Sequence, residues 1–312
     1  MKEKHGLKGV MAALKRKKLS LLQRKNRRTG MLLCIPAFLV VAFGVYTLGY
    51  ALVMSFNTNM GVIRGEFDFV GLENYVKTLQ NEEMRGVVGN TLLYAAATII
   101  TELVIGLVVS AALRKNYRGS GIAKVCIILP MMMAPIASGT IWRWMFTDRY
   151  GVINYFLELL HIDAPIWLAE KIPAKLAVLT ISVWTAAPFV ILVLVAAIGG
   201  ISDDILEAAR IDGASSIQTY WNIIFPLLKP SIAVILLIRI PDALKMYDIV
   251  FILTGGGPAN STQVISYYVY NQGFRQMKFA EASAASFLLF LVIAVFTVAL
   301  NAVMNRRKKE GQ

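Results

Sequence analysis

Six apolar runs, each long enough to cross a bilayer, constrain this chain more than any other feature of its sequence. They occupy residues 30–56, 87–113, 122–146, 174–198, 231–254 and 280–304, and about 20 apolar residues suffice for one helix to span the hydrocarbon core. With 57% hydrophobic residues, the chain of 312 carries more apolar surface than a soluble core needs. The sequence therefore predicts an all-α, polytopic membrane protein with six transmembrane helices and both termini on one side of the membrane.

Positive charge indicates which side that is. The net charge is +13, and bases crowd residues 2–28 and 306–309, directly beside the first and last spans. Because Lys and Arg are enriched in cytoplasmic segments, we expect basic cytoplasmic tails at 1–29 and 305–312 and a cytoplasmic loop at 114–121. Membrane lipid is the expected partner of the tails. No nucleic-acid partner is expected, because the bases flank spans and do not cover a folded surface.

The sequence carries no pattern typical of catalysis or cofactor binding. Cys34 and Cys126 lie in apolar runs and are expected to pack there, while His5 and His161 are too few and too far apart for a metal site. No GxxxxGK[ST] phosphate loop occurs, so the chain cannot itself be an ATPase. We therefore expect no catalytic residues, no cofactor and no metal, and interpret the chain as a translocation protein, not an enzyme.

The segment 207–230, which reads EAARIDGASSIQTYWNIIFPLLKP, is polar and lies between two apolar spans. Its small residues Ala208 and Ala209 favour a helix and allow a partner backbone to approach closely. Glu207 and Arg210 are three residues apart and can pair on one exposed face. A short amphipathic helix is therefore predicted here.

Residues that disfavour helical structure follow this predicted helix. Asp212-Gly213 is expected to end it, because Gly takes a positive φ without strain. Pro226 and Pro230 are expected to end a second helix before the next span begins. The segment is thus predicted to form a helix-turn-helix.

The spacing of these residues resembles the cytoplasmic coupling loop of permease subunits in binding-protein-dependent ABC importers. Phe225 stands where that family usually has Leu. The resemblance implies a helix-turn-helix coupling loop at 199–230 that docks on an ATPase, within a permease domain at 30–304 in the bacterial cytoplasmic (inner) membrane. The residues it implies for ATPase coupling are Glu207, Ala208, Ala209, Asp212, Gly213, Ile223 and Pro226.

Short stretches elsewhere resemble the carbohydrate-uptake, maltose-type branch of these permeases. They lie at residues 71–75, 90–91, 150–155 and 254–258, although Leu244 departs from the aromatic residue usual in that branch. This resemblance implies import of a sugar or oligosaccharide. It also implies a second related permease subunit, two ATPase subunits and an extracytoplasmic solute-binding protein as partners.

Ionisable side chains within the apolar runs are a further functional signal, because a charge at the bilayer centre is costly unless it is paired or wetted. Arg239, Asp242, Lys245 and Asp248 alternate in sign at intervals of three residues, and Tyr247 adds an aromatic face. These residues fit a polar wall of the solute path and a structural salt ladder equally well.

Two candidates lie in other spans. Glu102 is expected to bond a neighbouring helix rather than the solute, and Trp184 can stack on a sugar ring or simply pack. The candidate path residues are thus Tyr247, Asp248, Lys245, Asp242, Trp184 and Glu102. Interior Pro130, Pro135 and Pro188 are expected to bend or break their helices.

The predicted mechanism is alternating access. Closure of the partner ATPases on binding ATP would move the docked coupling loops and open the cavity toward the loaded binding protein. A permease for another polar solute, such as a polyol or glycerol phosphate, is the alternative within this class. An autonomous secondary transporter would move solute without an ATPase, and a membrane enzyme would show turnover of its own.

Overall fold

The computed structural model describes residues 34–59, 68–114 and 119–310, with side chains through 302 and at 304. Regular structure in these residues is helical, apart from one isolated antiparallel bridge between Asn57 and Phe69. The predicted all-α class is confirmed. The predicted basic tail 1–29 lies outside the described residues, as do residues 115–118 of the predicted loop 114–121 and the side chains of the tail 305–312.

Among the described residues, five helices are long and apolar enough to cross a membrane, and counting one bent pair as a span gives six. The five are Cys34–Ser55, α4 (Glu82–Leu113), α8 (Lys171–Gly199), the run Ser216–Leu253, and Phe279–Ala302 of α14 (Phe279–Glu310). The bent pair comprises α5 (Ser120–Met132) and α6 (Pro135–Met145). Each predicted apolar run therefore corresponds to one span or to the bent pair.

The chain divides into two compact units, residues 1–53 and 54–312, which are described separately. In the first unit, the helix that begins at Cys34 exposes most of its large apolar side chains, including Phe38, Val40 and Phe43. A helix that is apolar on all sides is typical of a membrane span.

Helices α4 and α8 make the most extensive helix contact of the second unit. Gly106 of α4 permits this approach, because a Cβ at that position would lie 2.7 Å from Cγ1 of Val190 and 3.1 Å from Cδ1 of Leu194. Both α8 residues are fully buried, in a cluster that also contains Ile198 and Leu228. A small residue at such a crossing lets membrane helices pack closely.

Proline explains the break between α5 and α6. Pro130 lies inside α5, Met133 and Ala134 are extended, and Pro135 begins α6, where its missing N–H removes no helical bond. Because the residue before a proline avoids the helical conformation, the two helices meet at 99°. The prediction that prolines interrupt the third span is confirmed, whereas α8 continues without a break through Pro188.

The loop 199–230 forms two helical arms. Its elements are α9 (Asp203–Ile211), α10 (Ser216–Thr219) and the π-helical segment η1 (Tyr220–Ile224), which leads into α11 (Phe225–Leu244). The Ser202 side chain caps α9 by accepting from the Asp204 N–H, and Ser215 with Gln218 forms a capping box on α10. Such caps satisfy N–H groups that have no partner within the helix.

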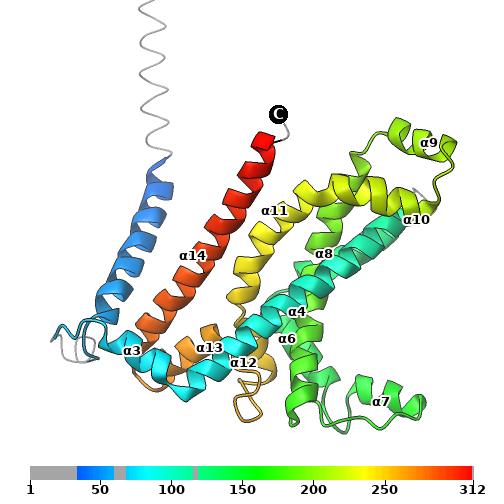
Figure 1. Cartoon of the computed structure of the whole chain (residues 1–312). Helices are drawn as coiled ribbons and strands as arrows, with labels where there is room; N and C mark the ends of the chain where they lie inside the picture. The colour runs from blue at the N-terminus through cyan, green and yellow to red at the C-terminus, as the bar shows by residue number, and fades with distance from the viewer. Residues whose placement is uncertain (1–33, 60–67, 115–118, 311–312) are drawn as a thin grey trace, which may run out of the picture. The chain divides into compact units, whose positions relative to one another are not determined.

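Pro226 and Pro230 do not end the second arm, so that prediction is wrong. Both lie within the first turns of α11, and helical structure continues from Ser216 to Leu244, with a bend that is visible in Figure 1. The wider turn of η1 supplies the local adjustment by which membrane helices accept proline. The fifth span is also interrupted, because three non-helical residues separate Leu244 from α12 (Asp248–Leu253).

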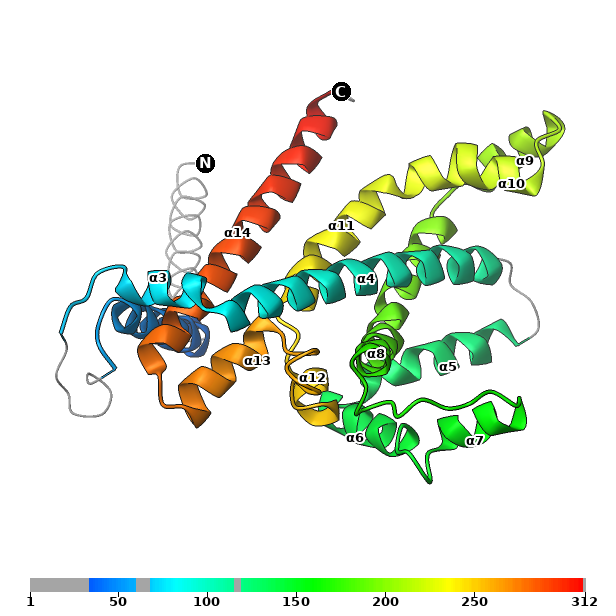
Figure 2. The same cartoon turned by 60° about the horizontal axis from the view of Figure 1, so that its bottom comes forward.

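The α9–α10 loop and the C-terminal end of α14 lie at one end of the second unit, and several short elements lie at the other (Figures 1 and 2). These are α3 (Glu73–Gln80), α7 (Val152–Leu159), α12, α13 (Ile265–Tyr270) and η2 (Asn271–Arg275). Hydrogen bonds tie α13 and the loop before it to α4. Asn90 Nδ2 donates to the Gln263 carbonyl at 3.1 Å, and the Ile265 N–H donates to Thr91 Oγ1 at 2.9 Å.

Candidate functional site

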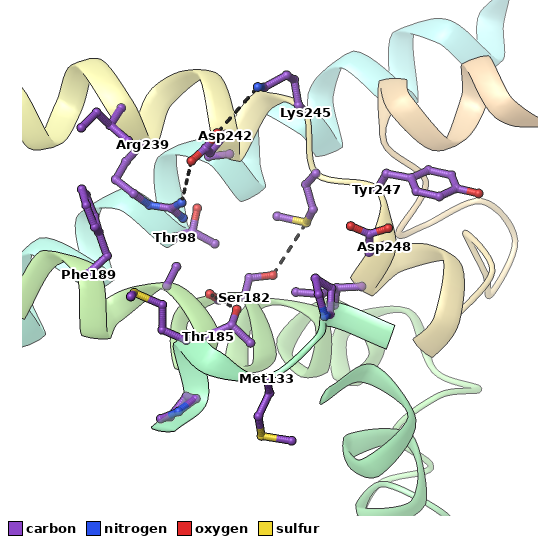
Figure 3. A pocket seen from close by; sticks show the side chains of 18 residues that line it. Thr98, Met133, Ser182, Thr185, Phe189, Arg239, Asp242, Lys245, Tyr247 and Asp248 are labelled. Carbon is purple, nitrogen blue, oxygen red and sulfur yellow. Dashed lines mark hydrogen bonds and ion pairs between the residues drawn. The ribbon is translucent and has the colours of Figure 1, made fainter. Parts of the chain in front are cut away.

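A cavity of about 710 Å³ opens among helices α4, α5, α6, α8, α11 and α12 (Figure 3). Its wall combines apolar side chains with hydroxyls and charges. The polar and aromatic members labelled in Figure 3 are Thr98, Ser182, Thr185, Phe189, Arg239, Asp242, Lys245, Tyr247 and Asp248. Four of the six path residues predicted from the sequence are thus brought together: Asp242, Lys245, Tyr247 and Asp248.

Both helix interruptions contribute to this wall. The break after Leu244 places Lys245, Met246 and Tyr247 in the lining, and the break before Pro135 does the same for Met133. Non-helical backbone at membrane depth is tolerated where it is buried in protein or lines a cavity. The interruptions are therefore part of the site.

A buried ion pair joins α4 to α11 beside the cavity. Arg239 Nε donates to Glu102 Oε2 at 2.9 Å and Arg239 Nη2 donates to Glu102 Oε1 at 2.9 Å. The Glu102 side chain is only 1% exposed. This two-pronged bond matches the geometry of a guanidinium to that of a carboxylate, and it agrees with the expectation that Glu102 bonds a neighbouring helix.

The rest of the charge series continues from this pair toward the cavity. Arg239 Nη1 lies 3.4 Å from Asp242 Oδ2, and Lys245 Nζ lies 3.7 Å from Asp242 Oδ1. Asp242 is about half exposed, at 48%. No ion pair or hydrogen bond of the Asp248 side chain is found among the described residues. The charge series therefore begins with a structural ion pair at Arg239 and ends as a polar wall of the cavity at Asp248.

The other two predicted path residues do not line the cavity. The Trp184 ring meets the Trp142 ring edge-on, with centroids 5.5 Å apart, so it packs against another aromatic ring. Glu102 approaches the cavity only through Arg239.

Sequence reasoning missed several lining residues. Thr98, Ser182 and Thr185 each present a hydroxyl, and Met133 and Phe189 supply apolar surface. One signal was available, because Ser182 and Thr185 are three residues apart in an apolar run and so share one helix face. Thr98 and Thr101 have the same three-residue spacing in the span of α4, so the sequence held a similar signal for Thr98.

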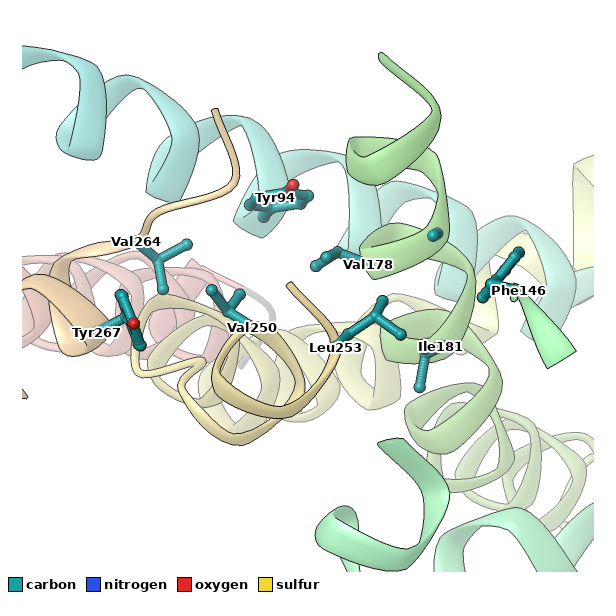
Figure 4. Packing of buried hydrophobic residues seen from close by; sticks show 9 residues of the cluster. Tyr94, Phe146, Val178, Ile181, Val250, Leu253, Val264 and Tyr267 are labelled. Carbon is teal, nitrogen blue, oxygen red and sulfur yellow. The ribbon is translucent and has the colours of Figure 1, made fainter. Parts of the chain in front are cut away.

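An apolar cluster holds α12 in place next to the cavity (Figure 4). Val250 and Leu253 of α12 are buried against Val178 and Ile181 of α8 and against Phe146. Because Asp248 is the first residue of this helix, the packing of its apolar face fixes where the Asp248 carboxylate lies.

The coupling loop exposes most of the residues predicted for docking. Leu206 and Ala209 are buried, and they attach α9 to the rest of the chain. Glu207 and Ala208 are exposed on the other face. Ala209 therefore faces the chain's own core and cannot offer a partner the close approach that its small size suggested. No ion pair between Glu207 and Arg210 is found in the described part of the chain.

The turn of the loop has the expected backbone. Gly213 has a φ of +76°, and nothing lies within 4 Å of the position its Cβ would take. Ile211 and Ile217 flank this turn and are 86% and 73% exposed. These two isoleucines were not predicted as site residues, although exposed apolar side chains on a polar loop are typical of an interaction surface.

The remaining coupling candidates lie along the two arms. Asp212 is the C-cap that follows α9 and is exposed, Ile223 in η1 is half-buried, and Pro226 in α11 is exposed. Among the described residues, no group of His, Cys, Asp or Glu side chains could hold a metal ion.

Comparison with known proteins matches residues 102–310 to the family described as binding-protein-dependent transport system inner membrane component. The chain is 32% identical over 280 residues to the trehalose/maltose transport system permease protein MalF of Thermococcus litoralis, covering 89% of this chain and 94% of that one. It is 32% identical over 272 residues to the trehalose transport system permease protein SugA of Mycobacterium tuberculosis, covering 86% of each. A solved bacterial ABC transporter involved in import of the acidic polysaccharide alginate has a similar fold, with a TM-score of 0.79 at 22% identity, covering 91% of this chain and 98% of that one.

Proposed function

The chain belongs to the family of binding-protein-dependent transport system inner membrane components, and on that premise we propose that it is the permease subunit of an ABC importer for a sugar or oligosaccharide. The observation that carries the proposal is the extent of the family match. Residues 102–310 include the coupling loop and most of the cavity wall. The sugar class is supported by the relatives, since both named permease proteins belong to trehalose or maltose transport systems.

The coupling loop is proposed to dock on a partner ATPase through its exposed face. Glu207 would form the polar part of the contact, and Ala208, Ile211 and Ile217 the apolar part, with Gly213 setting the angle between the arms. An apolar centre within a polar rim is the usual composition of a protein interface. ATP hydrolysis would then take place in the partner ATPase.

The cavity is proposed as this subunit's share of the solute path. This chain and a related second permease subunit would together form the path. The path would open alternately to each side of the membrane as the ATPases close and open. The solute would be delivered by an extracytoplasmic solute-binding protein.

The proposal predicts that transport requires partners. We expect the purified chain to bring down a second permease and an ATPase, and the reconstituted complex to take up sugar only with ATP and a solute-binding protein. The measurement is uptake of radiolabelled maltose and trehalose into proteoliposomes. Uptake by the chain alone would instead identify a secondary transporter, and chemical conversion of the sugar would identify an enzyme.

A second prediction concerns topology. We propose that both termini and the coupling loop face the cytoplasm, since the bases flank the corresponding spans. In a background with Cys34→Ala and Cys126→Ala, Asp163→Cys and Asn260→Cys should react from outside with an impermeant thiol reagent. Ser216→Cys and Gln312→Cys should react only after the membrane is opened. Labelling of Ser216→Cys in sealed cells would contradict this orientation.

A further inference from the structure

We propose that the cavity selects an uncharged, hydroxyl-rich solute and discriminates against anionic ones such as sugar phosphates. This inference rests on the proposed function, because it assumes that the cavity belongs to the solute path. It separates two solute classes that the sequence leaves open, namely neutral sugars or polyols and glycerol phosphate.

The hydroxyl groups of the wall donate their protons to backbone carbonyls of their own helices. Thr98 Oγ1 donates to the Tyr94 carbonyl at 2.6 Å, Ser182 Oγ to the Val178 carbonyl at 2.7 Å, and Thr185 Oγ1 to the Ile181 carbonyl at 3.0 Å. A hydroxyl has one proton and two lone pairs. Each of these groups is therefore left with lone pairs to offer the cavity, and acts there as an acceptor.

The carboxylates add to this excess of acceptors. Asp242 is about half exposed, and Asp248 is exposed with no partner found for its side chain among the described residues. Ionised carboxylates can only accept hydrogen bonds. A solute that enters the cavity thus meets the accessible acceptors of Thr185, Asp242 and Asp248, while Thr98 and Ser182 line the cavity but are largely buried.

Cationic donors on the wall are few, and one of the two is occupied. Arg239 is the more buried of the two bases, and its three nitrogens face Glu102 and Asp242. Lys245 is 57% exposed and lies 3.7 Å from Asp242. Counting Glu102 behind the wall with Asp242 and Asp248 on it, three acidic side chains stand against the two bases Arg239 and Lys245, an excess of one negative charge.

A sugar or polyol suits this wall because each of its hydroxyls can donate. A phosphate dianion has little to donate and would lie beside the carboxylates of Asp242 and Asp248. Like charges on the solute and the wall repel each other. In addition, acceptors of the phosphate and of the wall would lose their hydrogen bonds to water and gain none in exchange. The geometry therefore favours the neutral member of any pair of related solutes.

The experiment compares matched pairs on the assembled complex in nanodiscs, without the solute-binding protein, so that only the path discriminates. The probes are radiolabelled trehalose and trehalose 6-phosphate, maltose and maltose 1-phosphate, and glycerol and glycerol 3-phosphate. We expect the neutral member to bind more tightly by roughly tenfold or more. Asp248→Asn should reduce that preference severalfold, because it removes a charge for which the described part of the chain offers no partner. Asp148→Asn, an exposed carboxylate outside the cavity lining, should leave it unchanged.

Two results would overturn the inference. Equal or tighter binding of the phosphorylated members, or the same preference in Asp248→Asn, would show that the wall does not discriminate by charge, while sugar import itself would stand. If no member of any pair binds, and the complex with its binding protein imports none of them, both the selectivity and the proposed sugar function fail.

Discussion

Replacing Gly213 with Val is expected to abolish coupled uptake while the chain still inserts into the membrane. Gly213 has a φ of +76° in a turn with open space around its Cα, so the loss would come from backbone strain and not from a clash. The left-handed conformation costs an ordinary L-residue about 1–2 kcal/mol, and a β-branched residue more. A penalty of about 2 kcal/mol lowers the population of the native turn by roughly thirtyfold.

The measurement is uptake per assembled complex, together with the ATPase activity stimulated by loaded binding protein. Gly213→Asn should keep most of the activity, because Asn adopts positive φ more readily than other residues. Gly199→Ala is the matched control, since Gly199 also has open space but lies at the end of α8 without a positive φ. Glu207→Lys tests the charge on the neighbouring helix and should weaken docking. Normal coupled transport in Gly213→Val and Glu207→Lys would exclude this loop from the docking surface.

Removing the Glu102 carboxylate is expected to have the second large effect, on assembly instead of coupling. Glu102→Ala would leave the Arg239 guanidinium buried without its two-pronged partner. Breaking a buried ion pair from one side costs about 3–5 kcal/mol, because the remaining charge stays uncompensated. We expect a marked fall in the yield of folded chain and a lower melting temperature in detergent.

Two further variants separate a structural pair from a general loss of charge. Glu102→Leu combined with Arg239→Met should recover much of the stability, because no unpaired charge remains. Asp242→Asn should cost about 1 kcal/mol or less, since its contact with Arg239 is longer, at 3.4 Å, and Asp242 is half exposed. If the double variant is as unstable as Glu102→Ala, the pair does not hold α4 to α11.

The spans could be predicted from the sequence because apolar length is a local property. The same holds for the break before Pro135 and for the positive φ at Gly213, since each depends on one residue and its immediate neighbours. The failure at Pro226 has a physical cause. A proline ends a helix in water more readily than in a membrane protein, where a wider turn such as η1 supplies the local adjustment.

The candidate site could be predicted only in part. Asp242, Lys245, Tyr247 and Asp248 are close in sequence, so one polar segment indicated all of them. The partner of Arg239 lies 137 positions away, and no periodicity connects it to Arg239. Nor does a sequence show whether a Ser or Thr hydroxyl donates its proton to a carbonyl of its own helix. That bond decides whether the hydroxyl acts as a donor or as an acceptor toward the cavity.

The unbroken course of α10, η1 and α11 has a mechanical consequence. The helix bends between the loop and Leu244 (Figure 1), yet no flexible linker interrupts it between the exposed Ile217 at one end and Asp242 at the other. A continuous bent helix moves as one rigid body, so a rotation of one arm displaces the other arm. A tilt imposed at the loop would therefore reach the Asp242 carboxylate as a sideways displacement of the cavity wall.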